Sequence, residues 1–171
     1  MRDLKACLAA AASLACVFTT TPAGAEPVSR SLVVNATGAC NGALPSFEGA
    51  IRKRPTAISN EGAANAFVSC SLAGDVLNTG NIDLQVGFTN KTDAPVSFAC
   101  TFVDGYAQGF FGAVPVYYPT TVAVAASSIG AAQWTAEEGA SFGNNANVSC
   151  VLPPGVEINL LLVQFDEDNG V

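Results

Sequence analysis

The chain contains no histidine, and this absence excludes several kinds of chemistry at once. Ser-His-Asp and Cys-His catalysis, histidine metal sites and histidine proton relays all need an imidazole ring. Serine-lysine catalysis has no signature either, because neither Lys53 nor Lys91 follows a serine in an S-x-x-K motif. We therefore predict a protein that is not an enzyme and that uses no cofactor and no metal.

Charged residues are also scarce, at 12% of the chain, and few of them are basic. Beyond residue 25 there are five basic and thirteen acidic residues, which gives a formal charge of −8. A surface of this sign repels phosphate backbones and anionic headgroups, so we expect neither nucleic acid nor a membrane surface as a partner. Arg52-Lys53-Arg54 could bind an anion, but three charges are few and a solvated turn is the preferred interpretation.

Hydrophobic runs long enough to cross a bilayer are missing as well. The apolar run Ala6 to Phe18 follows Arg2 and Lys5, and Ala23-Gly24-Ala25 is a small-x-small cleavage site. This pattern predicts a bacterial signal peptide that is cleaved from the chain. The competing interpretation, a lipidated Cys16, is weakened because the lipobox would then contain a serine where an aliphatic residue is expected.

Removal of residues 1–25 leaves residues 26–171, which is enough chain for one domain with one hydrophobic core. We expect this domain to be exported to the periplasm or the extracellular space and not to be an integral membrane protein. Four cysteines remain after cleavage, and thiols oxidise in such compartments. No two of them are closer than thirty residues, so a zinc site is not indicated and two structural disulfides are predicted: Cys40, Cys70, Cys100 and Cys150, in any of three pairings.

Three segments around these cysteines share one pattern of alternating side chains. Ala66–Leu72, Val96–Phe102 and Ala146–Leu152 each place apolar residues and the cysteine in one phase and mostly polar residues in the other. Alternate side chains of a strand share a face, so each segment is predicted to be a strand with its cysteine facing the core. Cysteines in that position would suit bridges between two packed sheets.

The remaining pattern completes an all-β prediction. Ile82–Phe88 alternates and is expected to form a hairpin with the Cys100 strand through Asn90–Pro95. Leu160–Val163 has no polar face, which predicts a central strand covered on both sides. Further strands are expected at Arg30–Asn35, Val114–Tyr118, Thr121–Ala126, Ala131–Thr135 and Glu157–Phe165, with helical candidates only at Ala43–Lys53 and Thr135–Ala140.

About eight short strands with Gly, Asn, Pro and Asp turns predict an antiparallel β-sandwich, immunoglobulin-like in the broad sense. Pro115 and Pro119 place the Tyr117-Tyr118 segment at a sheet edge, because proline cannot donate to a strand ladder.

One glycine-rich aromatic segment is the candidate binding loop. Aromatic rings beside a carboxylate and an amide can receive a sugar ring or a peptide side chain, so glycan and protein are the partners considered. The alternative is that these aromatic rings only cover one end of the core. The candidate residues are Asp104, Tyr106, Gln108, Phe110, Phe111, Tyr117 and Tyr118.

The signal, the Val-Ser-Cys-x-Leu strands and Ser149–Gly155 together resemble uncharacterised small exported β-rich proteins of Gram-negative bacteria. That resemblance implies a structural framework and carries no activity, substrate or site. Pilin-type subunits are a second comparison, but Asp166–Val171 lacks their alternating terminal strand with a penultimate tyrosine.

The function hypothesis is a non-enzymatic exported β-sandwich that acts by surface binding or as an envelope component. Two alternatives stay open. One is a subunit of a surface polymer that assembles by strand addition. The other is a polysaccharide hydrolase that uses two carboxylates, for which the candidates are Asp104, Glu137, Glu138 and Asp166.

Overall fold

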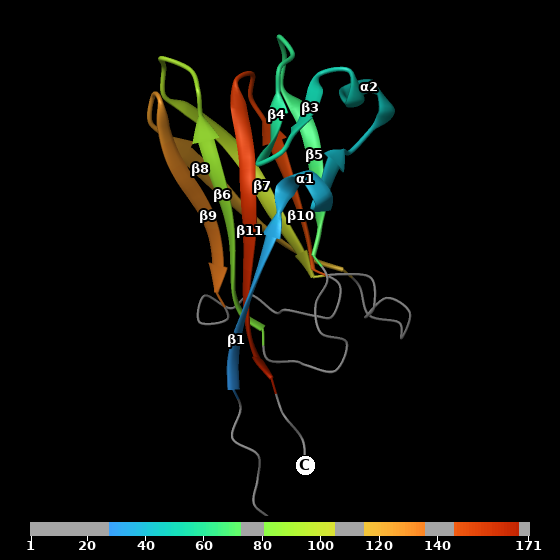
Figure 1. Ribbon diagram of the computed structural model, residues 1–171, viewed down its shortest axis with the longest axis vertical. Helices are drawn as coiled ribbons and strands as arrows, with labels where there is room; N and C mark the ends of the chain where they lie inside the picture. The colour runs from blue at the N-terminus through green and yellow to red at the C-terminus, as the bar shows by residue number, and fades with distance from the viewer. Residues whose placement is uncertain (1–27, 73–80, 105–114, 136–145, 168–171) are drawn as a thin grey trace, which may run out of the picture.

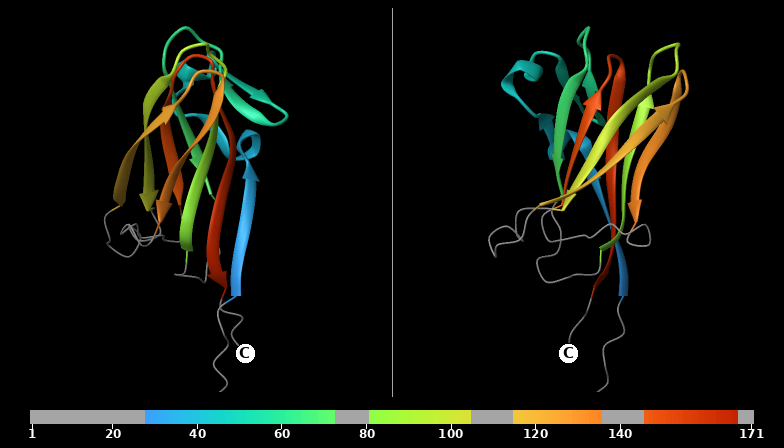
Figure 2. Two further views of the ribbon diagram at one scale, coloured as in Figure 1. Left: turned by 90° about the vertical axis from the view of Figure 1, so that its left-hand side faces the viewer. Right: turned by 180° about the vertical axis from the view of Figure 1, so that it is seen from behind.

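The computed structural model describes residues 28–72, 81–104, 115–135 and 146–167. The predicted signal peptide lies outside these residues. The described part is a sandwich of two antiparallel sheets (Figure 1, Figure 2). In chain order its elements are β1 (Val28–Asn35), α1 (Ala36–Ala39), β2 (Cys40–Gly42), α2 (Pro45–Glu48), β3 (Ile51–Arg54), β4 (Ala57–Asn60), β5 (Ala66–Ser71), β6 (Asn81–Asn90), β7 (Val96–Asp104), β8 (Val116–Val124), β9 (Ser128–Thr135), β10 (Asn147–Leu152) and β11 (Val156–Glu167).

One sheet has six strands and the other five. The five-stranded sheet has the order β2-β5-β10-β7-β8. In the six-stranded sheet the order is β3-β4-β11-β6-β9, and β1 pairs with β11 beyond the end of β4. In Figure 1, β1 and β11 run side by side toward the lower end of the molecule. The predicted all-β sandwich is therefore confirmed, with short strands at β2, β3 and β4 that the sequence pattern did not reveal.

The period-two pattern around the cysteines is confirmed as the inner face of the five-stranded sheet. In β5 the residues alternate strictly between buried and exposed, and β7 and β10 follow the same phase. The inner side chains pack against the inner face of the six-stranded sheet, where Phe88 meets Phe98 edge-to-face with ring centroids 5.1 Å apart. Burial of alternate apolar side chains is thus what positions the two layers.

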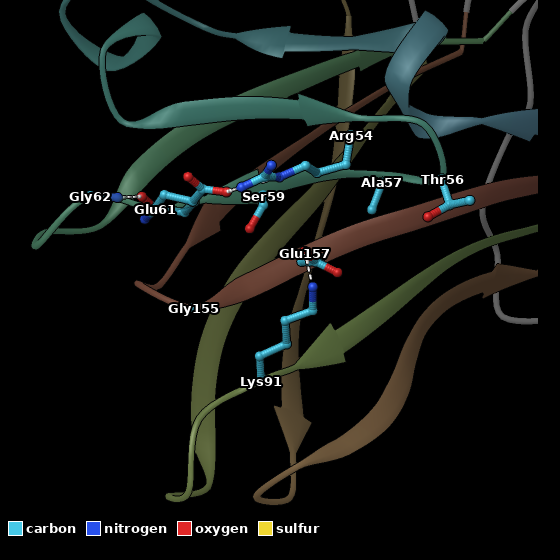
Figure 3. Close-up of a pocket in the computed structure, with 10 residues that line it drawn as sticks. Arg54, Thr56, Ala57, Ser59, Glu61, Gly62, Lys91, Gly155 and Glu157 are labelled. Carbon is cyan, nitrogen blue, oxygen red and sulfur yellow. Dashed lines mark hydrogen bonds and ion pairs between the residues drawn. The ribbon is translucent and has the colours of Figure 1, made fainter.

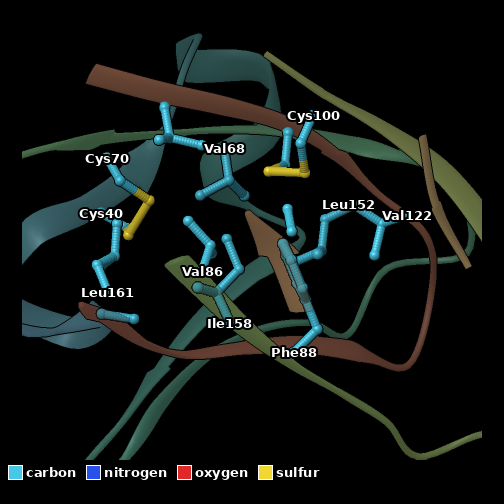
Figure 4. Close-up of a cluster of buried hydrophobic side chains, with 14 of the residues drawn as sticks. Cys40, Val68, Cys70, Val86, Phe88, Cys100, Val122, Leu152, Ile158 and Leu161 are labelled. Carbon is cyan, nitrogen blue, oxygen red and sulfur yellow. A yellow bond between two sulfur atoms is a disulfide. The ribbon is translucent and has the colours of Figure 1, made fainter. Parts of the chain in front are cut away.

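The structure pairs Cys40 with Cys70 and Cys100 with Cys150 (Figure 4). In each pair the two cysteines are directly opposed on neighbouring strands of the same sheet, with Cα atoms 4.0 and 4.1 Å apart. The expectation of bridges between the two sheets is therefore wrong. A core-facing cysteine can reach a cross-strand neighbour on its own face as readily as a residue across the core.

The predicted hairpin through Asn90–Pro95 is also wrong. The turn does reverse the chain, but β6 belongs to the six-stranded sheet and β7 to the five-stranded one. Each strand pairs with neighbours that are distant in sequence: β6 with β9 and β11, and β7 with β8 and β10. The turn therefore connects the two layers instead of closing a two-stranded ribbon.

Leu160–Val163 forms part of β11, which is a central strand as predicted. It is not covered on both sides, however. Leu161 and Val163 are buried, whereas Leu160 is 39% exposed and Leu162 is half-buried. A register shift between Ile158 and Leu160 lets Ile158 and Leu161 both point into the core, which leaves Leu160 on the outer face.

The helical predictions are mostly wrong. Within Ala43–Lys53 only the single turn α2 is helical. The C-terminal end of this segment belongs to strand β3. Thr135 ends strand β9, and the rest of the second candidate lies outside the described residues. The helical turn α1 was not predicted; Asn35 caps it by accepting a hydrogen bond from the Thr37 amide at 2.8 Å.

Candidate functional site

The candidate binding loop is only partly described. Tyr106, Gln108, Phe110 and Phe111 lie outside the described residues, so they stay predictions. Asp104 is buried at the end of β7. Tyr117 and Tyr118 lie on β8, which is one of the two edge strands of the five-stranded sheet, and this confirms the edge position predicted from Pro115 and Pro119.

The two adjacent tyrosines have different surroundings because strand side chains alternate between faces. Tyr118 is half-buried, and its ring stacks on Phe102 with centroids 5.6 Å apart. Tyr117 is 63% exposed. Tyr118 therefore covers the core, as the alternative interpretation of the loop proposed, whereas Tyr117 is available to a ligand.

A pocket of about 270 Å³ lies where the edge strands β8 and β9 meet; we call it the aromatic pocket. The two strands belong to different sheets, and the indole Nε1 of Trp134 joins them by donating a hydrogen bond to the Tyr118 carbonyl oxygen at 2.8 Å. Two tyrosines, a proline and a tryptophan provide its apolar surface. Its lining residues are Tyr117, Tyr118, Pro119, Thr120, Gln133, Trp134 and Thr135.

A polar network continues from the aromatic pocket onto the outer face of the six-stranded sheet. Gln133 and Gln85 both donate their side-chain amides to Asp83 Oδ2, at 3.0 and 3.2 Å. These interactions hold the Gln133 side chain by its nitrogen, and its carbonyl oxygen can act as an acceptor. The combination of ring faces, an oriented amide and threonine hydroxyls suits a polyhydroxylated ring.

A second and larger pocket, about 530 Å³, lies around strands β3, β4 and β11 (Figure 3); we call it the polar pocket. It contains no aromatic side chain. It shares no residue with the aromatic pocket and is lined by Arg54, Thr56, Ala57, Ser59, Asn60, Glu61, Gly62, Lys91, Gly155 and Glu157.

Two ion pairs organise the polar pocket. Arg54 pairs with Glu61, and Lys91 Nζ lies 2.5 Å from Glu157 Oε1. The first pair is solvated, with side chains 56% and 38% exposed. In the second pair the Lys91 side chain is 59% exposed, whereas the Glu157 side chain is only 7% exposed. Both carboxylates already bind a basic side chain, so the pocket does not present the unpaired carboxylate pair of an acid-base hydrolase.

Sequence reasoning missed the polar pocket because its residues come from three separate stretches of chain, around residues 54–62, at Lys91 and at 155–157. The only local signal was Arg52-Lys53-Arg54. Lys53 points elsewhere and donates to Asn41 Oδ1 at 2.7 Å, while Arg54 pairs with Glu61. The basic run is therefore divided between ion-pair and hydrogen-bond partners.

The described residues contain no group of three or more acidic, cysteine or histidine side chains that could hold a metal ion. Within the same ranges, no helix is long and apolar enough to span a bilayer.

No family model and no curated protein matches the chain. Among solved structures, it is similar to CBM35 from Cellvibrio japonicus Abf62, at 12% identity and a TM-score of 0.46 over 82% of this chain and 100% of that one. It is also similar to CsCBM6-3 from Clostridium stercorarium in complex with cellobiose, at 10% identity and a TM-score of 0.43 over 76% and 90%. A match to the GH26-CBM35 β-(1,4)-mannanase of Podospora anserina has 10% identity and a TM-score of 0.40, and covers 82% of this chain but only 28% of the mannanase. Similarity at this level assigns no ligand to the chain.

Proposed function

We propose that this protein is an exported, non-enzymatic β-sandwich that binds an uncharged glycan in the aromatic pocket. The observation that carries the proposal is a pocket lined both by the exposed Tyr117 and by Gln133, whose side-chain nitrogen is held by Asp83. A sugar ring would stack on the tyrosine, and its hydroxyls would donate to the Gln133 carbonyl oxygen.

Charge and size support an uncharged ligand of this kind. The chain beyond residue 25 has a formal charge of −8, which disfavours anionic polysaccharides. A pocket of about 270 Å³ is small for a protein partner and is open at a sheet edge, where one ring of a longer chain could enter. Export is supported by the signal-like N-terminal sequence and by two fully buried disulfides.

The two alternatives gain less support. None of the hydrolase's candidate carboxylates lines the polar pocket, and Glu137 and Glu138 lie outside the described residues, so that alternative stays a prediction. For the surface polymer, the central strand β11 offers no vacant position, because β6 lies on one side and both β1 and β4 on the other, so an added strand would have to pair with an edge strand such as β8 or β9.

The test is a glycan array followed by calorimetry with the best ligand, using wild type, Tyr117→Ala and Phe67→Ala. We expect Tyr117→Ala to lose about tenfold in affinity, which corresponds to about 1.4 kcal/mol, because one stacking face is removed. Phe67→Ala is the matched control: it removes an aromatic side chain that is 44% exposed on β5, outside the aromatic pocket. Equal affinity of both variants, or no glycan bound by the wild type, would contradict the proposal.

A further inference from the structure

The floor of the polar pocket has two buried polar side chains next to each other. Ser59 on β4 and Glu157 on β11 are directly opposed in register, so their side chains share one face of the sheet. As whole residues, Ser59 is 4% exposed and Glu157 is 5% exposed, and both line the pocket (Figure 3). A ligand that enters the pocket therefore meets a hydroxyl and a carboxylate at its base.

Both floor side chains have unused hydrogen-bonding capacity. Glu157 Oε1 binds Lys91 Nζ at 2.5 Å, but Oε2 has no hydrogen-bond partner among the described residues. Within those same residues the Ser59 hydroxyl has no partner either. A buried carboxylate with one open oxygen is a strong acceptor, because little water screens it.

Burial decides which charge dominates the pocket. Its formal charges balance, two basic against two acidic, and Arg52 points to the same side from β3. However, Arg52 is exposed, and the Arg54 and Lys91 side chains are 56% and 59% exposed, so water and salt screen them. Glu157, at 7%, is the one deeply buried charge among the four, so a cationic group gains most by binding here.

The walls of the polar pocket are held in place before any ligand arrives. The Gly155 amide donates to the Asn60 carbonyl oxygen at 2.8 Å, and the Lys91 amide donates to the Gly155 carbonyl oxygen at 3.0 Å. Asn60 also donates its side-chain amide to the Leu152 carbonyl oxygen at 2.7 Å. Three turns are thereby joined, and a rigid pocket loses little entropy on binding.

We propose that the polar pocket is a second binding site, separate from the aromatic pocket, for a small molecule that carries a primary ammonium group. The ammonium donates to Glu157 Oε2 and to Ser59 Oγ, and the rest of the molecule occupies the remainder of the 530 Å³. Lys91 already supplies one ammonium to the same carboxylate from the rim, so it competes with the ligand for Glu157. Amino sugars and aliphatic polyamines both present this chemistry.

Calorimetry with glucosamine tests the inference, at slightly acidic pH where the amine is protonated. N-acetylglucosamine is the matched uncharged sugar, and 1,5-diaminopentane is the amine without a sugar ring. We expect glucosamine to bind and N-acetylglucosamine not to bind at this site. Binding of 1,5-diaminopentane as tight as that of glucosamine would assign the site to aliphatic amines, and weaker binding would assign it to amino sugars. If neither amine binds, the inference is wrong.

Variants locate the site and separate it from the proposed glycan site. We expect Glu157→Gln to lose about tenfold in affinity for glucosamine, because it removes a charge-assisted hydrogen bond. Ser59→Ala should lose several-fold, and Lys91→Met should gain several-fold because its competing ammonium is gone. Glu48→Gln and Lys53→Met, which make the same charge changes outside the pocket, should bind as the wild type does.

Tyr117→Ala should also leave glucosamine binding unchanged, because the two pockets share no lining residue. If Glu157→Gln lowers the melting temperature too far for calorimetry, Ser59→Ala and Lys91→Met still test the site by opposite changes in affinity. A loss of affinity in Lys91→Met would overturn the inference, because it would mean that the lysine itself recognises the ligand. If no glycan in the array bound the wild type, the proposed glycan site would be wrong, but binding of glucosamine in the polar pocket would be unaffected.

Discussion

Asn60 and Asn90 occupy equivalent positions in two successive turns that connect the six-stranded sheet to the five-stranded one. Each side-chain amide donates to the carbonyl oxygen four residues later, at 2.9 Å to Ala64 and 2.8 Å to Ala94. Each side-chain oxygen accepts the backbone amide two residues later, from Gly62 and Thr92, at 2.9 Å in both cases. Both asparagines are fully buried, and each stands ten residues before a bridged cysteine.

Asn90→Ala should lower the free energy of unfolding by about 3 kcal/mol. The substitution removes buried hydrogen bonds to the Ala94 and Ala125 carbonyl oxygens and leaves those oxygens without this donor. Asn60→Ala should have an effect of similar size. Urea denaturation measures both, with Asn41→Ala as an exposed control that should stay within about 0.5 kcal/mol of the wild type. A loss at Asn90 no larger than that of the control would show that the turn does not depend on this side chain.

Gly155→Ala should destabilise the protein by about 1 to 3 kcal/mol. Gly155 has a φ of +75°, and an added Cβ would lie 2.6 Å from Thr92 Cγ2. Gly38→Ala is the matched control, because a Cβ there meets nothing within 4 Å and Gly38 lies in α1. The control should be neutral or slightly stabilising in thermal denaturation. Equal melting temperatures for the two variants would contradict this account of the turn.

Removal of either disulfide should cost about 3 to 4 kcal/mol in the chain-entropy model, because the closed loops span 30 and 50 residues. The paired replacements Cys40→Ala with Cys70→Ala, and Cys100→Ala with Cys150→Ala, should each leave the other bridge intact. Peptide mapping without reduction measures the pairing, and urea denaturation measures the stability. Peptides that link Cys40 to Cys150 would contradict the observed topology.

Trp134 should report occupancy of the aromatic pocket. It is the only tryptophan in the chain, it lines that pocket, and its indole contacts Phe102 and donates to Tyr118. A glycan bound there should change the tryptophan emission, whereas glucosamine in the polar pocket should not. Trp134→Phe should abolish the signal and cost about 1 kcal/mol of stability through the lost hydrogen bond. An emission change of equal size for both ligands would mean that the signal does not distinguish the two pockets.

Much of the inner face was predictable from local sequence. Val68, Phe98 and Val148 were grouped with their cysteines by alternation alone, and all three are buried. The edge position of Tyr117 and Tyr118 also followed from local chemistry, because proline in a strand removes a donor. By contrast, alternation could not show that Ile158 and Leu161 share a face, because the register shift between them interrupts the period.

The candidate site was only partly predictable. Tyr117 was predicted as a ligand-binding residue from its own segment. Gln133, which also lines the pocket, and Asp83, which binds the Gln133 side chain, come from the distant strands β9 and β6. The polar pocket left no sequence pattern, because Ser59 and Glu157 become neighbours only through the pairing of β4 with β11.

By itself the sequence determined the features that depend on a residue and its immediate neighbours: alternating burial, turn residues, the excess of acidic charge and the absence of imidazole chemistry. Removal of apolar side chains from water acts on each residue individually, so it is visible as a pattern of alternating residues along the local sequence. Strand partners, the pairing of the cysteines, the crossing between sheets after Asn90 and the two pockets were decided by the tertiary structure alone. These features depend on register between distant segments, and that register is set by packing of the whole core.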